Sequence, residues 1–415
     1  MKKTEIAIIG GGASGMAAGI AAAQKGRQVI VVEGLPRVGK KLLATGNGRC
    51  NLTNLGADYR GYHGEKPEFV KGAFEQCNVE DTLNFFRILG LETKVEDEGK
   101  VYPWSDQANS VIDLMRNELE ALCQEVITGT MVTGLENTEK GFLLKTESGE
   151  SISAEKVIIA TGGKAAPHLG SLGIGYDLAK GLGHTVTDLY PGIVQIKCEH
   201  PRLKSIKGIK IQGELSLFKE QELIRKERGE ILFTDYGISG PPTLQVSRGV
   251  HQRTSENLQK YIRIDSFPTL NEAKLYETVW MMVGLGGNKA MDLIVSGIMN
   301  KALGRVFLKE AGIHPEEPGR NLNEEKVQKL CNIMKRWDLK VSGTLSWKNA
   351  QVTIGGVSTS EIEAKTMESK LVKGIYFCGE ILDVDGDCGG YNLQWAWSSG
   401  IVAGEKAAKE CMPDK

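Results

Sequence analysis

A glycine-rich motif near the N-terminus is the first part of the sequence that indicates a chemical function. Gly10, Gly12 and Gly15 make the pattern G-x-G-x-x-G, and Glu33 follows at the distance typical of a ribose-binding acid. Such glycines allow a tight turn, close approach to a diphosphate and close packing of the following helix. The motif predicts a dinucleotide site, and Glu33 disfavours NADP because it would repel a 2′-phosphate. It does not separate FAD from NAD, and a glycine turn of an unrelated α/β protein is the alternative.

The elements around this motif are the ones it needs. Residues 5–9 are a short apolar run typical of a buried parallel strand, residues 16–25 form an Ala-rich helix, and residues 28–32 form a second strand. The start of this helix carries free N–H groups and roughly half a positive charge, which suits a diphosphate. We therefore expect Ala13 and Ser14 to contact the cofactor together with the three glycines.

A second polar segment, residues 40–54, follows where an NAD dehydrogenase would usually continue with another helix and strand. In FAD enzymes an extended loop at this point runs along the diphosphate toward the isoalloxazine ring, and glycines there let the backbone lie flat against it. A surface loop rich in turn residues is the alternative. The expected cofactor contacts in this loop are Lys40, Lys41, Gly46, Asn47, Gly48, Arg49, Cys50 and Asn51.

Two later segments also favour FAD. Residues 156–160 predict a buried strand that ends in a turn at Thr161, Gly162 and Gly163, and Val132 is expected near the adenine. A strand near 374–378 leads to an acidic loop, which suits the ribityl hydroxyls, and then to a helix beginning near Tyr391. The start of that helix is expected to face flavin N1 and O2, where the reduced ring carries negative charge. The expected contacts here are Gly379, Glu380, Asp387, Gly390, Tyr391, Asn392 and Leu393.

The remaining sequence predicts an α/β fold with a Rossmann-like, discontinuous FAD-binding domain, residues 1–191 and 342–415. Between them, residues 192–341 show short strands with turns about every ten residues, which predicts a small β-barrel or sandwich, and then helices over 271–337. Residues 344–352 are expected to lead back to the nucleotide sheet. The loop over 230–242 either covers the flavin or forms a rigid turn between the domains.

Composition narrows the class of protein. The 415 residues contain 51 Lys and Arg against 52 Asp and Glu, so net charge does not steer the chain to nucleic acid or to an anionic membrane. There is no signal segment and no run near the roughly 20 apolar residues of a membrane span. Eight cysteines lack CxxC pairs and zinc spacing, so reduced thiols, no metal site and a cytoplasmic location are expected.

Several blocks of sequence resemble one known family. They are GGGASGMAAGIAAA, GKKLLATGNGRCNLTN, VIIATGG, LFTDYGISGP, VTIGGVSTSEIEAKTMESK and GIYFCGEILDVDGDCGGYNLQWAWSSG. Together they resemble the bacterial BaiN-like (YhiN-like) FAD-dependent oxidoreductases, and they span essentially the whole chain. The resemblance implies an FAD domain interrupted by a β-barrel with a helical part, and NAD(P)H-dependent reduction of conjugated bile-acid ketones or oxidation of small aminoketones. Residues 284–288, unusually rich in glycine for a helix, and Cys388, where Thr is expected, depart from the pattern.

These observations predict a reductase of a conjugated small-molecule ketone, such as a steroid-like enone. Because no second complete G-x-G-x-x-G unit exists, NADH or NADPH is expected to dock transiently, and the hydride passes through flavin N5. Cys50 and Tyr236 are the candidate proton donors, although a structural role is favoured for each. An oxygen-dependent amine or aminoketone oxidase, and a flavin redox sensor or RNA-associated flavoprotein, are the alternatives. The oligomeric state is not predicted.

Overall fold

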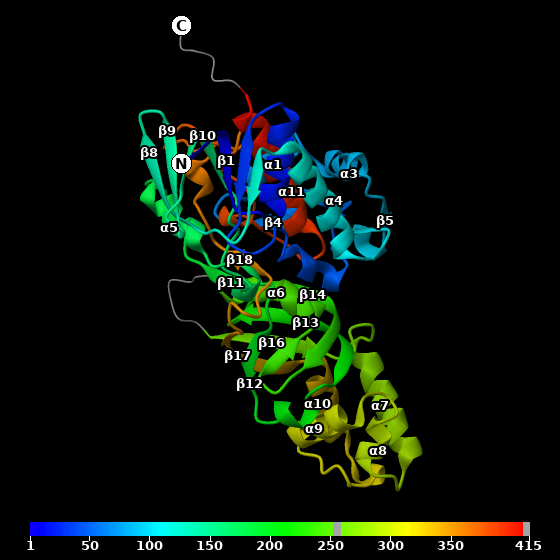
Figure 1. Ribbon diagram of the computed structural model, residues 1–415. Coiled ribbons are helices and arrows are strands. Elements are labelled where there is room, and N and C mark those ends of the chain that lie inside the picture. The colour runs from blue at the N-terminus through cyan, green and yellow to red at the C-terminus, as the bar shows by residue number, and fades with distance from the viewer. Residues whose placement is uncertain (252–258, 410–415) are drawn as a thin grey trace. The chain divides into compact units, whose positions relative to one another are not determined.

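The computed structural model describes residues 1–251 and 259–409. The chain divides into two compact units (Figure 1). The first unit combines Met1–Pro191 with Ala350–Lys415, and the second is Gly192–Asn349. Each unit has its own hydrophobic core.

The first unit is built on a seven-stranded sheet in the order β7-β2-β1-β10-β9-β8, with β19 paired to β10. Four pairings are parallel, and in them β1 and β10 are in register at Ile8 and Ile158. The central strands are rich in Ile and Val because both faces of a parallel sheet are covered. The strands are β1 (Lys2–Ile9), β2 (Val29–Val32), β7 (Glu125–Ile127), β8 (Val132–Thr138), β9 (Gly141–Thr146), β10 (Ser151–Ile159) and β19 (Ile375–Phe377).

The first and last helices of the chain pack side by side on this sheet, as the blue and red ribbons of Figure 1 show. They are α1 (Ala13–Gln24) and α11 (Tyr391–Ala407). A Cβ at Gly400 would lie 2.5 Å from the Ser14 carbonyl oxygen, and one at Gly404 would lie 2.3 Å from that of Ala18. Glycines on α11 therefore allow a backbone contact that no larger residue permits.

Smaller elements surround the sheet. Two-stranded pairings join β4 to β20 and β11 to β18, and β3, β6 and β5 form a third small sheet. After the barrel, the chain re-enters the first unit at Ala350, where β18 pairs with β11, and β19 is the strand that rejoins the large sheet. These elements are β3 (Thr53–Asn54), β4 (Tyr62–His63), β5 (Thr93–Val95), β6 (Lys100–Pro103), β11 (Tyr190–Gly192), β18 (Val352–Ile354), β20 (Asp385–Gly386), α2 (Val70–Phe74), α3 (Val79–Ile88), α4 (Ala108–Leu122) and α5 (Ile174–Gly181).

The second unit contains a closed antiparallel barrel in the order β12-β15-β14-β13-β16-β17. The expected domain boundary at residue 342 falls inside β17, whose pairing with β12 continues to Thr344, so the barrel extends further along the chain. Its strands are β12 (Ile196–Glu199), β13 (Lys210–Lys219), β14 (Glu222–Phe233), β15 (Gly237–Ser239), β16 (Lys260–Asp265) and β17 (Trp337–Thr344).

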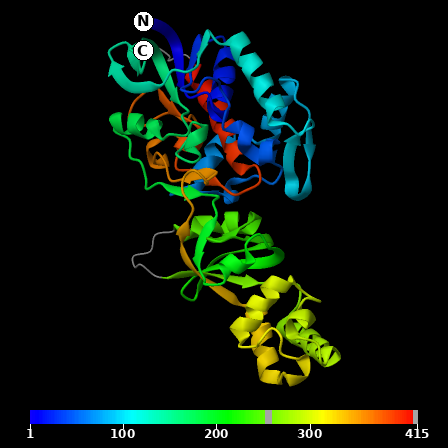
Figure 2. The ribbon, with the colours of Figure 1, turned by 60° about the horizontal axis from the view of Figure 1, so that its bottom comes forward.

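Helices complete the second unit (Figure 2). The Asn271 and Asn323 side chains accept hydrogen bonds from the amides of Lys274 and Lys326, so each residue caps the N-terminus of a helix. The glycine run after residue 283 ends α7 at Gly287, which has a φ of 51°. The helices are α6 (Pro241–Val246), α7 (Glu272–Gly286), α8 (Met291–Val295), α9 (Lys301–Ala311) and α10 (Glu324–Lys335).

Candidate cofactor site

The glycine-rich turn between β1 and α1 is shaped for two different purposes. A Cβ at Gly10, where φ is 105°, would lie 2.5 Å from the Ala160 carbonyl oxygen, and one at Gly15 would lie 1.9 Å from that of Gly10. These glycines are required by the protein's own packing. A Cβ at Gly12 would meet nothing within 4 Å, and no side chain caps α1 there. Gly12 therefore leaves open space at uncapped amides, which is what a diphosphate requires.

Glu33 lies at the end of β2 with its carboxylate fixed by the neighbouring backbone. Its two oxygens accept hydrogen bonds from the amides of Gly11 (2.7 Å) and Leu35 (2.8 Å). Each carboxylate oxygen can accept a further bond, so the ribose hydroxyls of a dinucleotide can still donate to it. The Thr130 amide donates to the Glu33 carbonyl (3.0 Å), which brings the segment before β8 to this point. The side chain of Val132 is buried at the start of β8.

An ion pair between Lys41 and Glu380 joins four distant segments. Lys41 Nζ lies 2.7 Å from Glu380 Oε2, and Glu380 Oε1 accepts a bond from the Thr353 amide (2.8 Å). The Thr353 hydroxyl in turn accepts bonds from the amides of Lys164 (2.7 Å) and Ala165 (3.0 Å). A Cβ at Gly163 would lie 2.3 Å from that hydroxyl, so the predicted glycine turn is required here. Sequence reasoning missed Thr353, which lies on a three-residue strand without a periodic signal.

Two buried hydroxyls at this turn have no hydrogen-bond partner among the described residues: Thr161 Oγ1 and Tyr176 Oη. Burial raises the pKa of Tyr176 well above its usual range, and the nearby carboxylates of Glu380 and Asp383 add to the effect. Tyr176 lies on α5, which the sequence did not mark as part of the site. Gly162, with a φ of 69°, makes the turn that precedes it.

The start of α11 is open in the same way as the start of α1. Gly390 has a φ of 104°, its Cβ would lie 2.4 Å from the Thr53 carbonyl, and no side chain caps the helix. The Asn392 amide accepts a bond from the Gly386 N–H (2.8 Å) and donates to the Gly386 carbonyl (2.7 Å), which fixes the acidic loop to the helix. Tyr391 and Leu393 are half-buried in the first turn.

The loop of residues 40–51 bends through three consecutive left-handed residues: Gly46 (φ 56°), Asn47 (φ 57°) and Gly48 (φ 85°). A Cβ at Gly46 would lie 2.6 Å from the Asn51 amide nitrogen. When the oxygen and nitrogen of the Asn51 side-chain amide are exchanged, both atoms find partners. The NH₂ group then donates to the Thr53 carbonyl, and the oxygen accepts from the Gly390 N–H (3.2 Å). The loop is thereby attached to the start of α11. Lys40 lies half-buried at its beginning.

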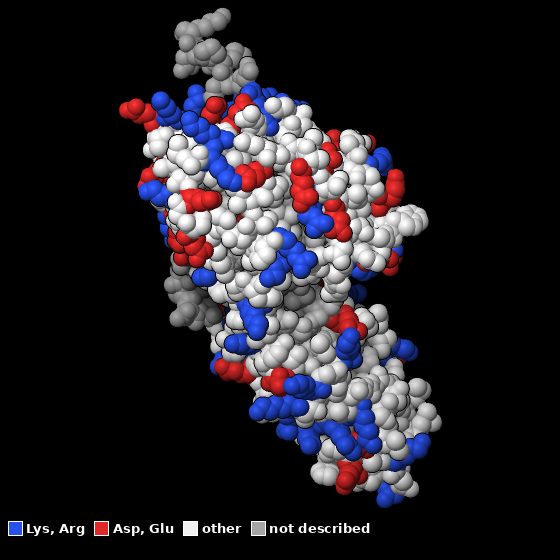
Figure 3. Space-filling model, viewed as in Figure 1, with Lys and Arg blue, Asp and Glu red and all other residues white. Residues whose placement is uncertain are grey.

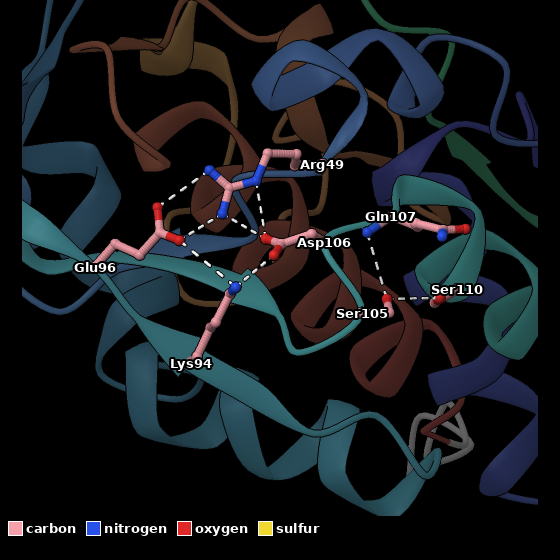
Figure 4. A network of polar contacts seen from close by, with 7 residues as sticks. All are labelled: Arg49, Lys94, Glu96, Ser105, Asp106, Gln107 and Ser110. Carbon is pink, nitrogen blue, oxygen red and sulfur yellow. Dashed lines mark hydrogen bonds and ion pairs between the residues drawn. The ribbon is translucent and has the colours of Figure 1, made fainter.

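Arg49 of this loop takes part in a network of charged side chains with Lys94, Glu96 and Asp106 (Figure 4). Its guanidinium donates to Asp106 (Nε to Oδ1, 2.9 Å) and to Glu96 (Nη1 to Oε2, 3.1 Å), and it lies 4.1 Å above the Tyr102 ring. Lys94 Nζ donates to Asp106 at 2.5 Å. These contacts lower the pKa of both carboxyl groups. The guanidinium is held by the protein's own carboxylates, and the contact of Arg49 with the cofactor remains a prediction.

The two candidate proton donors differ in setting. Cys50 is fully buried with a φ of 60°, and burial raises the pKa of its thiol to about 12, so the thiol is a poor proton donor. Tyr236 belongs to the second unit, where it is half-buried between β14 and β15 and its carbonyl accepts a bond from the Cys198 amide (2.9 Å). Burial therefore argues against the Cys50 thiol as the proton donor.

The near-zero net charge conceals two oppositely charged units. Residues 192–349 contain 25 Lys and Arg against 18 Asp and Glu, a net charge of +7, and the rest of the chain contains 26 against 34, a net charge of −8. Figure 3 shows cationic side chains gathered over the barrel and helices of the second unit. Three of the cations near the start of this unit, Arg202, Lys207 and Lys210, pair with Glu310, Asp235 and Glu230. Total charge alone is therefore a poor guide to what the second unit binds.

Other classes of site are not found in the part of the chain that the structure describes. No group of three or more His, Cys, Asp or Glu residues is placed to hold a metal ion within residues 1–251 and 259–409. Seven described cysteines are free thiols, and Cys411 lies outside the described residues. No described helix is both long and apolar enough to cross a bilayer.

The described residues fit FAD. Two uncapped helix starts, a fixed acid at the end of β2 and a left-handed loop between them match the diphosphate, ribose and ring ends of a flavin dinucleotide. The N-terminal motif supplies only some of these parts. The fold brings in the others, because β19 pairs with β10 and α11 packs on α1 although they are far apart in the sequence.

The chain resembles known proteins along nearly its whole length. The family model "HI0933-like protein Rossmann domain" matches residues 4–406. A 3-dehydro-bile acid delta(4,6)-reductase of Clostridium scindens is 39% identical over 407 residues, covering 97% of this chain and 99% of the relative. A ribosomal RNA dihydrouridine synthase of Escherichia coli is 31% identical and covers 96% of each chain. Among solved structures, an E. coli quinol fumarate reductase subunit has a TM-score of 0.49 at 16% identity, covering 98% of this chain and 70% of that one.

Proposed function

Since the chain belongs to the HI0933-like family and is an FAD-dependent oxidoreductase, we propose that it reduces a carbon–carbon double bond conjugated to a ketone in a small, steroid-like molecule. The observation that carries the proposal is the 39% identity to a bile-acid reductase along 99% of that relative's length. A match of that extent includes both units of the chain, so it covers the inserted barrel as well as the nucleotide fold.

The names of the relatives share one kind of chemistry. A delta(4,6)-reductase acts on double bonds in a 3-keto bile acid, and a dihydrouridine synthase saturates the uracil ring, whose C5–C6 double bond is conjugated to a carbonyl. Both reactions add a hydride and a proton across an activated double bond. The shared chemistry supports a conjugated carbonyl compound as the substrate class for this chain.

Bound FAD would supply the two-electron chemistry, and the residues of the first unit would hold and tune it. Gly10, Gly12 and Gly15 would let the uncapped amides of α1 approach the diphosphate, and Glu33 would accept from the ribose hydroxyls. Lys41 and Glu380 hold the loop and the strand end together beside the cofactor. The uncapped amides of α11 would stabilise negative charge that develops on the ring.

NADH or NADPH is proposed as the electron donor, docking without a nucleotide fold of its own. The test is anaerobic rapid mixing of the FAD-loaded protein with each nicotinamide, followed by 3-oxo-4-cholenoic acid as the enone probe. We expect bleaching of the flavin absorbance by one nicotinamide and its recovery on adding the enone. No bleaching with either nicotinamide would exclude the reductase, and recovery only on admitting oxygen, with an amine as the reductant, would favour the oxidase.

A second candidate, reduction of uridine within RNA, is favoured by the charge of the second unit. A net charge of +7 over residues 192–349 is the kind of surface that phosphates attract, and two relatives are ribosomal RNA dihydrouridine synthases. Filter binding of ribosomal RNA fragments at 50 mM and 200 mM salt separates the candidates. Retention of RNA that falls steeply with salt, together with loss of uridine from digested RNA after incubation with NADPH, would favour RNA as the substrate. No retention of RNA at 50 mM salt would exclude RNA as the substrate.

A further inference from the structure

A histidine and an aspartate from opposite ends of the first unit's sequence meet beside the start of α11. His63 Nε2 lies 2.9 Å from Asp387 Oδ1, although 324 positions separate them in the chain. Their side chains are 26% and 24% exposed, so solvent and a small molecule can reach both. A hydrogen bond from a carboxylate fixes the ring orientation and tautomer of an imidazole, as in other acid–base pairs.

The pair is attached to the helix end that is proposed to face the flavin ring. His63 lies on β4, which pairs with β20 through Asp385 and His63. The hydroxyl of the neighbouring Tyr62 donates to the Tyr391 carbonyl (2.8 Å), and the Asp387 amide donates to the Gly61 carbonyl (2.9 Å). The short strand β4 therefore carries the imidazole, and its hydrogen bonds attach it to the first turn of α11.

Other titratable groups of the first unit are less suited to deliver a proton. The Cys50 thiol is buried and its pKa is raised to about 12, and burial likewise raises the pKa of Tyr176. The His184 side chain is fully buried between Glu361 and Ser369. His168 is exposed and makes no ion pair among the described residues. His63 alone among these combines access, a fixing carboxylate and an imidazole, the side chain that most often serves as a general acid.

We propose that His63 is the proton donor of the reduction and that Asp387 is its positioning residue; this rests on the proposed function. The carbon–carbon π bond breaks, the β carbon takes the hydride that NADH or NADPH provides by way of the flavin, and the α carbon takes a proton from the His63 imidazolium. The hydride brings two electrons and one hydrogen nucleus, the imidazolium gives a second hydrogen as a proton, and the neutral imidazole regains its proton from solvent.

The test compares the two half-reactions of FAD-loaded wild type, His63→Ala, His63→Gln, Asp387→Asn and, as a matched control, His168→Ala. In His63→Ala, His63→Gln and His168→Ala, we expect flavin content and the rate of bleaching by NAD(P)H to stay within about 2-fold of wild type, and the thermal midpoint to stay unchanged. Re-oxidation by 3-oxo-4-cholenoic acid should slow by about 100-fold or more in both His63 variants, the range that general acids contribute, and by less in Asp387→Asn.

Chemical rescue separates catalysis from structure. Added imidazole should restore re-oxidation in His63→Ala, with a rate that follows the imidazolium concentration as pH changes, and should leave wild type and His168→Ala unaffected. Several charged or titratable groups lie on the elements around His63: Asp58, Glu65, Asp383, Asp385, Asp387 and Tyr391. The pH dependence of re-oxidation in His63→Gln reports their contribution, so the contribution of His63 is the difference between the wild-type and His63→Gln pH profiles.

Three results overturn the proposal. Re-oxidation of His63→Ala at the wild-type rate would remove the donor role and leave the proposed function intact. A loss that affects both half-reactions equally and does not respond to imidazole would assign His63 a structural role. If wild type itself is bleached by NAD(P)H but not re-oxidised by the enone, the proposed substrate class fails first, and the donor role with it.

Discussion

Gly12→Ala separates the effect of a residue on FAD binding from its effect on the stability of the fold. The new Cβ would meet no protein atom within 4 Å, and the backbone there (φ −77°, ψ −169°) suits any residue. The substitution therefore places a methyl group only in the space where a diphosphate would lie. Gly15→Ala is its matched control, because there the Cβ would lie 1.9 Å from the Gly10 carbonyl oxygen.

The expected magnitudes follow from those distances. Alanine is a poorer N-cap than glycine by up to about 1 kcal/mol, while it lowers the entropy of the unfolded chain by an effect of about 0.4–1 kcal/mol, so the apoprotein stability of Gly12→Ala should change little. Losing one amide hydrogen bond to a charged diphosphate costs about 1.5–3 kcal/mol, which is roughly a 10- to 150-fold rise in the Kd for FAD. Gly15→Ala should lower the stability of the apoprotein by about 1–3 kcal/mol, because the backbone must shift.

The assay is FAD titration of apoprotein by quenching of flavin fluorescence, alongside urea unfolding of the same apoprotein samples. A wild-type Kd in Gly12→Ala would refute the placement of the diphosphate over this glycine. Equal losses of apoprotein stability in both variants would refute the distinction between the two glycines, whatever the effect on FAD.

Three further predictions concern stability and the limits of the site. Gly284→Ala in α7 should raise the free energy of unfolding by about 0.5–1 kcal/mol in urea titrations, because its Cβ meets nothing within 4 Å and alanine favours a helix; a loss of stability would contradict this. Burial lowers the pKa of His251 from 6.5 to about 4, so the unfolded chain binds more protons between these values, and stability should fall as pH drops from 6.5 toward 4. His251→Asn should flatten that dependence, and an unchanged slope would point to other groups. Arg49→Met should leave the flavin spectrum and the Kd for FAD within about 2-fold of wild type, because Glu96 and Asp106 hold the guanidinium; loss of FAD would place that side chain on the cofactor.

The sequence predicts the parts of the site whose geometry follows from local rules. Strand, glycine turn, helix and acid near the N-terminus form one continuous unit, so their spacing alone indicates a dinucleotide. The strand and helix near the C-terminus are also indicated by periodicity, although only the resemblance and the fold attach them to α1. The barrel is one of two expected outcomes, because short alternating strands suit a sandwich equally well.

The rest depends on contacts that no local pattern encodes. His63 and Thr353 lie on strands of two and three residues, too short for a period of two to be recognised, and their partners are far away in the chain. Cys50 has an ordinary position in a polar loop, yet the fold buries it completely. The direction of the Arg49 side chain depends on two carboxylates from later segments, which a reading of the loop alone does not include.

The contact between α1 and α11 sets an order of events during synthesis. A ribosome makes α1 before every strand of the barrel, and it makes Gly400 and Gly404 after all of those strands. The second unit can thus form while the nucleotide fold still lacks β19 and its closing helix. We therefore expect that a nascent chain halted before Tyr391 would hold a folded barrel but would lack the second helix start of the flavin site.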